Sequence, residues 1–142
     1  MSISARNQLA AKISAINTGA VNDVISVITA QGDTLTTVIT SDSTKRLNLS
    51  VGSDVIAIFK APSVIITTDN DLIYSSRNQL QGKITNITDG AVNAEISIET
   101  DNATPITAII TSQSVKNLNL SIGSDVTALI KASHIVLAVK QS

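Results

Sequence analysis

The sequence predicts an all-β protein built from two tandem OB-like barrels, each with five strands and one short helical turn. Three observations support this fold class. Ile, Val and Thr are abundant, and their branching at Cβ favours extended backbone. Short β-branched runs alternate with turn residues, and the second half of the chain repeats the first. Because aromatic residues make up only 1% of the chain, the core must consist of aliphatic side chains.

The repeat sets the domain organisation. A shift of 71 residues aligns the chain with itself without a gap, and 32 of the 71 aligned pairs are identical. This similarity is far beyond chance and predicts two units, residues 1–71 and 72–142. A unit of this size buries little surface and is only marginally stable alone. We therefore expect the two units, and several chains, to pack together.

Each element has its own local signal. Alternation of polar and apolar residues, or a short β-branched run between turn residues, predicts strands at 9–16, 35–40, 55–60, 64–68 and 94–100. Thr40 or Ser41 is placed to cap a helical turn that ends at an inward-pointing Leu47. Gly52 and Gly123 each precede Ser-Asp, which is typical of a turn. Five strands and one turn in about 70 residues fit a small Greek-key barrel.

Composition excludes several classes of protein. The net charge of −1 argues against a surface built for nucleic acid or anionic membrane. The absence of Cys excludes disulfides and thiolate chemistry. No apolar run approaches the length of a membrane span, and the N-terminus does not read as a signal peptide. The expectation is a cytoplasmic protein.

Four polar segments recur in register, and all of them donate hydrogen bonds or carry positive charge. They are Ser4 with Arg6, the loop 19–22 (GAVN), Ser43 in the helical turn, and Lys60, together with their counterparts Ser75 with Arg77, loop 90–93, Ser114 and Lys131. In an extended chain a Ser and an Arg two residues apart share one face. The set contains no carboxylate, so it suits an oxyanion, whose oxygens all accept hydrogen bonds.

Together the motifs SARN, GAVN, T-S-x-S-x-x-x-L and K-A-(P/S) resemble those of the molbindins, small molybdate-binding proteins built from the "Mop" unit. The resemblance covers the whole chain, once per repeat. It implies an OB-like barrel, a homotrimer in which six units pack together, and molybdate or tungstate bound between units in two kinds of site. It implies no cofactor and no metal bound as a cation.

Carried over by position, the resemblance implies one kind of site with Ser4, Arg6, Ser43, Lys60 and Ala61, and with Ser75, Arg77, Ser114, Lys131, Ala132 and Ser133 in the other copy. The second kind would use Gly19, Ala20, Val21 and Asn22, and Gly90, Ala91, Val92 and Asn93. Asn7 and Asn78 would brace the loop, and the single His134 is expected at the surface. The second copy departs at Ser76, which replaces Ala5, and at Ser133, which replaces Pro62, so the two copies need not bind equally.

The function predicted is reversible binding of molybdate or tungstate for storage, without catalysis. An enzyme is disfavoured because there is no repeated acid–base pair, and the repeated Asp54 and Asp125 are expected to make local turn contacts. Nucleic-acid binding is disfavoured because stacking aromatics are scarce. The alternative is a regulatory or accessory module of a molybdate transport system. No helix-turn-helix or phosphate-binding loop is visible in the sequence.

Overall fold

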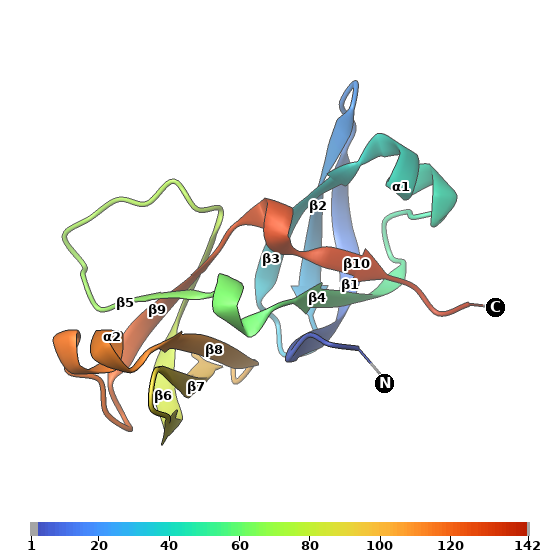
Figure 1. Ribbon diagram of the computed structural model, residues 1–142. Helices are drawn as coiled ribbons and strands as arrows, with labels where there is room; N and C mark the ends of the chain where they lie inside the picture. The colour runs from blue at the N-terminus through green and yellow to red at the C-terminus, as the bar shows by residue number, and fades with distance from the viewer. Residues whose placement is uncertain (1–2, 142) are drawn as a thin grey trace.

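The computed structural model describes residues 3–141, and these form two curled five-stranded antiparallel sheets (Figure 1). The first sheet contains β1 (Asn7–Asn17), β2 (Asn22–Thr29), β3 (Thr34–Thr40) and β4 (Asp54–Phe59). The second contains β6 (Asn78–Asp89), β7 (Asn93–Thr100), β8 (Pro105–Thr111) and β9 (Asp125–Ile130). The prediction of an all-β fold with two five-stranded units is confirmed.

The fifth strand of each sheet comes from the other repeat. The strand β5 (Ile65–Thr67) pairs with β9, and β10 (Val136–Ala138) pairs with β4. The resulting strand orders are β10-β4-β1-β2-β3 and β5-β9-β6-β7-β8. Figure 1 shows both short strands crossing to the opposite sheet. The repeat boundary near residue 71 therefore divides the sequence, whereas each sheet draws residues from both sides of it.

One short helix follows the third strand of each repeat. The helix α1 (Ser41–Arg46) has Thr40 as its cap, whose hydroxyl accepts the Ser43 N–H at 3.1 Å. The helix α2 (Ser112–Asn117) is capped in the same way by Thr111. Single 3₁₀ turns, η1 (Ala61–Ser63) and η2 (Ala132–His134), precede the exchanged strands. The cap is thus Thr40 rather than Ser41, and the buried residue of α1 is Thr44, while Leu47 is half-buried.

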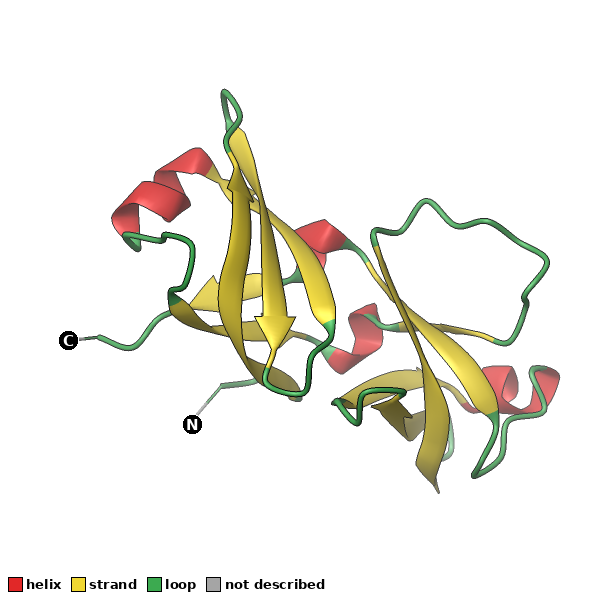
Figure 2. Ribbon diagram, turned by 180° about the vertical axis from the view of Figure 1, so that it is seen from behind, coloured by secondary structure: helices red, strands yellow, loops and turns green. Residues whose placement is uncertain are grey.

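The core is aliphatic, as the composition requires. Alternate residues of the strands point inward, and Phe59, the single Phe, is 1% exposed. At Gly52 and Gly123 the backbone has φ near +93° and +92°, a region that L side chains rarely adopt, so the predicted turns are confirmed. Figure 2 shows the two sheets from behind, with α1 and α2 at their outer ends and the 3₁₀ turns η1 and η2 between them.

Polar side chains join the two sheets at equivalent positions of the repeats. The Thr29 and Thr104 hydroxyls lie 3.3 Å apart, and the Thr100 hydroxyl donates to Asp33 Oδ2 at 2.6 Å. The Asn102 amide donates to the other oxygen of Asp33 at 3.0 Å. Every buried side-chain nitrogen and oxygen in the described residues has a hydrogen-bond partner. None of the helices formed by residues 3–141 is both long and apolar enough to cross a membrane.

Candidate functional site

The register of the sheets brings the predicted Arg and Lys residues together. Asn7 lies opposite Phe59 at the end of the β1–β4 ladder. Arg6 precedes Asn7 and Lys60 follows Phe59, so both residues lie just beyond the same end of this ladder. We call this position the ladder end. The same pairing of Asn78 with Ile130 places Arg77 beside Lys131 in the second repeat.

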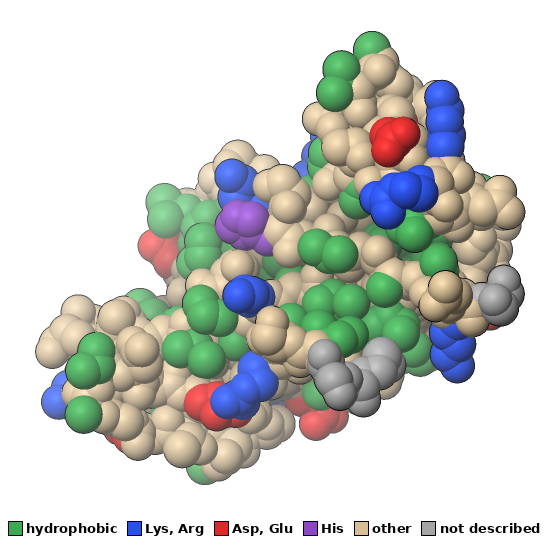
Figure 3. Space-filling model, turned by 45° about the vertical axis from the view of Figure 1, so that its right-hand side comes forward, with side chains coloured by type: hydrophobic (Ala, Val, Ile, Leu, Met, Phe, Trp, Pro, Cys, Tyr) green, Lys and Arg blue, Asp and Glu red, His purple; other side chains and the backbone are tan. Residues whose placement is uncertain are grey.

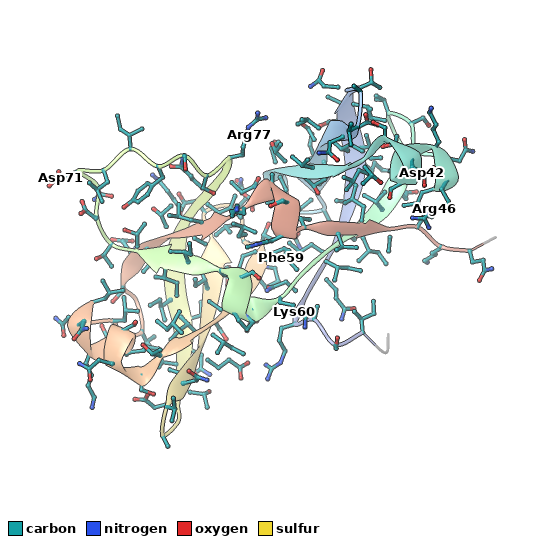
Figure 4. All side chains as sticks on the ribbon, turned by 45° about the horizontal axis from the view of Figure 1, so that its top comes forward. Asp42, Arg46, Phe59, Lys60, Asp71 and Arg77 are labelled. Carbon is teal, nitrogen blue, oxygen red and sulfur yellow. The ribbon has the colours of Figure 1, made fainter. Side chains whose placement is uncertain are left out.

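The exposure of these residues fits an extended segment with one open face. Ser4 and Arg6 are exposed, whereas Ala5 between them is buried. Lys60 is exposed, while Ala61 after it is buried. Figure 4 shows Arg77 projecting outward from the chain just before β6. Each ladder end therefore offers one hydroxyl and two cations to a ligand arriving from outside the chain.

At each ladder end, one buried Asn side chain is hydrogen-bonded to the other sheet. The side chain of Asn7 donates to the Thr107 carbonyl and accepts from the Thr107 N–H, both at 2.8 Å. Asn78 makes the same pair of bonds with Thr36, both at 2.7 Å. Each Asn side chain thus donates one hydrogen bond and accepts another, as the backbone of a paired strand does. These bonds join one repeat to the other. This contact fixes the Arg next to it relative to the neighbouring sheet.

Arg6 and Arg77 have different neighbours. The Arg6 guanidinium forms an ion pair with Glu95 on β7 of the other repeat. The position equivalent to Glu95 in the first repeat is Val24. Within residues 3–141, Arg77 has no ion pair. The first of the two ladder ends therefore contains a carboxylate that the repeat comparison does not reveal.

The predicted helical serines lie elsewhere in the chain. Ser43 and Ser114 are on α1 and α2, and Figures 1 and 2 show both helices well away from the first ladder end, where β1 begins. Their hydroxyls bond to the capping residues, Ser43 to Thr40 at 2.7 Å and Ser114 to Thr111 at 2.8 Å. A single chain does not gather Ser43 with Ser4, Arg6 and Lys60.

The loops 19–22 and 90–93 are hairpin tips that rest on these helices. The Ser41 N–H donates to Val21 O, and the Ser112 N–H donates to Val92 O, each at 2.8 Å. All four residues of each loop are exposed. Gly is required at the first position, because a Cβ on Gly19 would lie 2.2 Å from the Asn22 carbonyl oxygen. The structure thus forms two separate donor clusters per repeat, at the ladder end and at the hairpin tip.

The first hairpin tip also holds a carboxylate. Asp23 is buried directly after loop 19–22, and its Oδ1 accepts from the Gly19 N–H at 3.1 Å and the Ser41 hydroxyl at 2.7 Å. Sequence reasoning missed Asp23 and Glu95 because it searched for repeated residues. The signal that could have found them is a difference between the repeats, since each is an acid at a position where the other repeat has an apolar residue.

Several singled-out residues have structural partners. The Ser76 hydroxyl donates to the carbonyls of Asn78 and Ile130, at 3.1 and 3.2 Å, so this departure from Ala5 makes bonds inside its own barrel. Ser133 and His134 are exposed on η2. Residues 3–141 contain no group of three or more His, Cys, Asp or Glu side chains arranged to hold a metal ion.

Asp54 and Asp125 differ from the expectation of local turn contacts. Each begins a strand and forms an exposed ion pair across the sheet, Asp54 with Lys12 and Asp125 with Lys83. Hydrogen bonding and charge attraction from Asp125 raise the pKa of Lys83 above its ordinary value. Each of these acids is therefore paired across the sheet with a Lys that both repeats contain.

Comparison with known proteins agrees with this architecture. The model of the TOBE domain matches residues 3–66 and again 74–137. The chain belongs to the TOBE domain family. Its two TOBE units resemble, at a TM-score of 0.95 and 40% identity, a crystal structure of the cytoplasmic molybdate-binding protein ModG with molybdate bound. The match covers 99% of this chain and 100% of that one, and confirms the resemblance to the molbindins.

Curated relatives share the tandem TOBE region. The molybdenum-pterin-binding protein MopA of Rhodobacter capsulatus is 39% identical over 98% of this chain. The molybdenum transport protein ModE of Herbaspirillum seropedicae is 34% identical over 99% of it. The chain spans only 53% of the length of each of these two relatives. Their names describe binding and transport, and further relatives are named as transcriptional regulators.

Proposed function

We propose that this protein binds molybdate, and also tungstate, reversibly and without catalysis. The observation that carries the proposal is the full-length match to ModG, whose crystal structure contains molybdate. The donor clusters of this chain support it. Each ladder end presents exposed Arg, Lys and Ser side chains, which are the donors that a tetrahedral dianion requires.

The proposed ligand groups follow the two clusters. At the ladder ends they are Ser4, Arg6, Lys60 and Ala61, and Ser75, Arg77, Lys131, Ala132 and Ser133. At the hairpin tips they are residues 19–22 and 90–93. Since Ser43 and Ser114 lie away from the ladder ends of their own chain, we propose that they reach an anion held by a neighbouring chain. Sites that need several chains fit a homotrimer of two-unit chains.

The surface of the first barrel supports such an assembly. Residues such as Ala10, Ile28, Val51, Ile56 and Val139 line a mostly apolar groove of about 1040 Å³. Figure 3 shows hydrophobic side chains gathered in the middle of one face, with Lys and Arg around them. Exposed apolar patches of this kind mark interaction sites. Light scattering of the protein as it elutes from a size-exclusion column gives the mass of the assembly and so tests the trimer directly.

Binding is tested by melting the protein with molybdate, tungstate, sulfate and phosphate. A ligand that binds only the folded assembly at a hundredfold excess over Kd stabilises it by about 2.7 kcal/mol. We expect the melting temperature to rise with molybdate and tungstate and to stay unchanged with sulfate and phosphate. Equal responses to all four anions, or none, would contradict the proposal. An Arg6→Ala, Arg77→Ala variant that still binds with full stoichiometry would contradict the site assignment.

We propose intracellular storage as the role, with a regulatory or accessory role as the alternative. The regulatory role is favoured by relatives named ModE, of which this chain matches about half. The two roles differ in what removal of the protein does to cells. If the protein stores the anion, its removal lowers the molybdenum content of cells grown with ample molybdate. If the protein is a regulatory module, its removal changes the response of molybdate uptake to supply without lowering that content.

A further inference from the structure

The two hairpin-tip loops have the same sequence but different supports. Loop 19–22 is followed by Asp23 and is bonded to α1, which carries the buried Thr44. Loop 90–93 is followed by Ala94 and is bonded to α2, which carries the buried Val115. Ala94 and Val115 occupy the positions equivalent to Asp23 and Thr44. A buried polar pair in one repeat is thus matched by a buried apolar pair in the other.

In the first repeat, Asp23 accepts one hydrogen bond from the loop and one from the helix beside it. Its Oδ1 accepts from the Gly19 N–H and the Ser41 hydroxyl. Hydrogen bonds from Thr44, Ser41 and the Gly19 amide hold the pKa of Asp23 below its ordinary value. The carboxylate therefore carries its negative charge at neutral pH, and it does so at the base of the loop.

In the second repeat no carboxylate stands at the position of Asp23. The Ser112 hydroxyl donates to the Gly90 carbonyl at 2.9 Å, a bond that the Ser41 hydroxyl also makes with the Gly19 carbonyl, at 3.2 Å. Among residues 3–141 the Gly90 N–H has no hydrogen-bond acceptor. The side chain of Ala94, 1% exposed, supplies neither charge nor hydrogen bond. The Gly90 N–H is consequently open to an external acceptor, whereas the Gly19 N–H is bonded to Asp23.

Asp23 is not needed to shape its loop. Loop 90–93 has the same N–H bond from its helix and the same need for Gly, since a Cβ on Gly90 would lie 2.5 Å from the Asn93 carbonyl oxygen. It reaches this geometry with Ala94 alone. The difference between the repeats is therefore one of charge and donor occupancy, not of loop shape.

We propose that Asp23 acts as a resident anion that closes loop 19–22 to oxyanions, so that loop 90–93 is the hairpin-tip site of this chain. This inference rests on the proposed function and narrows its ligand groups, because only loop 90–93 of the two hairpin-tip loops then binds the anion. A dianion at loop 19–22 meets the negative charge of Asp23 at the base of the loop and finds the Gly19 N–H already bonded. Repulsion from that charge lowers affinity by about tenfold or more.

The test exchanges the buried pairs between the repeats. The variant Asp23→Ala, Thr44→Val gives the first repeat the pair of the second, and Ala94→Asp, Val115→Thr does the reverse. Calorimetric titration with molybdate counts the sites, and ¹H–¹⁵N spectra follow the Gly19 and Gly90 amides. In the unaltered protein we expect molybdate to shift Gly90 and leave Gly19 in place. The first exchange adds sites and makes Gly19 respond, and the second removes sites and silences Gly90.

A single substitution serves as a control in case the exchanged pairs disturb folding. Asp23→Asn removes only the charge, and the dispersion of the spectra reports folding of each variant. Equal responses of Gly19 and Gly90 in the unaltered protein would overturn the inference alone. So would unchanged stoichiometry in Asp23→Asn and both exchanges. A protein that binds no molybdate at all would overturn the proposed function together with this inference.

Discussion

The carboxylate of Asp33 lies buried where the two barrels meet, and it accepts hydrogen bonds from Thr100 and Asn102 of the other repeat. Burial acts to raise the pKa of Asp33, but hydrogen bonds from Thr100, Thr104 and Asn102 outweigh it and hold the pKa below its ordinary value. A carboxyl group whose pKa is lowered by folding stabilises the protein above its unfolded pKa of about 4. That stabilisation is lost as the pH falls through the folded pKa.

We therefore expect Asp33 to contribute to acid unfolding. Asp33→Ala should cost about 1–3 kcal/mol at pH 7, because it leaves buried donors without an acceptor. Asp33→Asn should reduce the difference in stability between pH 6 and pH 3, since an amide does not titrate there. Urea unfolding at several pH values measures both effects. A constant difference between Asp33→Asn and the unaltered protein across this range would contradict the prediction.

Glu95 is another acid without a counterpart in the other repeat, and it pairs with Arg6 across the repeats. The pair is partly exposed, so Glu95→Val should change stability by less than about 1 kcal/mol. If Arg6 binds the oxyanion as proposed, the loss of Glu95 should tighten molybdate binding a few-fold, because the guanidinium no longer shares its charge. The matched variant Val24→Glu places an acid at the equivalent position of the first repeat and should weaken binding. Titration calorimetry on both variants checks this, and identical affinities would contradict it.

Residues of this kind mark the limit of what the sequence predicts. The repeated donors could be found by aligning the chain with itself, and strand register then places Arg6 beside Lys60. Asp23 and Glu95 could not be found in this way, because their effect depends on contacts with a neighbouring hairpin or helix. Asp54 and Asp125 were found but misinterpreted, since the cross-strand register that pairs each with a Lys is not visible locally.

At the scale of elements, the strands and the helical turn follow from local patterns, but the exchange of β5 and β10 does not. The predicted segment 64–68 has the β-branched composition of a strand, and β5 indeed forms there. Its composition does not specify which sheet it joins. That choice depends on the direction in which the preceding turn η1 leaves the sheet, and η1 packs against β8 of the other repeat.

The exchange predicts that removal of one repeat's last strand weakens the other repeat's sheet. Deletion of residues 136–142 leaves the edge of β4 unpaired, where Ile56 and Ile58 face Ala138 and Val136. Amide hydrogen exchange at β4 should then rise strongly, while β9 keeps its pairing with β5 and β6. Mass spectrometry of peptides from both strands measures this. Faster exchange in β9 than in β4 would show that the strands are not exchanged in solution.

At the scale of the whole molecule, the two barrels have the same backbone fold but different surfaces. The groove of the first barrel is lined by apolar residues such as Ala10, Ile28 and Ile56. The equivalent pocket of the second barrel is smaller, about 360 Å³, and is lined by polar residues including Gln81 and Asp101. An apolar face retained on one barrel only is expected where that barrel contacts another chain.

This asymmetry leads to a prediction about assembly. Ile28 is 42% exposed, and its counterpart in the second barrel is Glu99. Ile28→Glu gives the first barrel the residue that the second already carries at the same strand position, so folding should be preserved. A charge in an apolar contact costs affinity because it must be desolvated without a partner, and the variant should elute as smaller species than the unaltered protein. Light scattering measures the mass, with Glu99→Gln as the matched change on the polar face, which should leave it unaltered. An unchanged mass for Ile28→Glu would place the contact between chains on another face of the molecule.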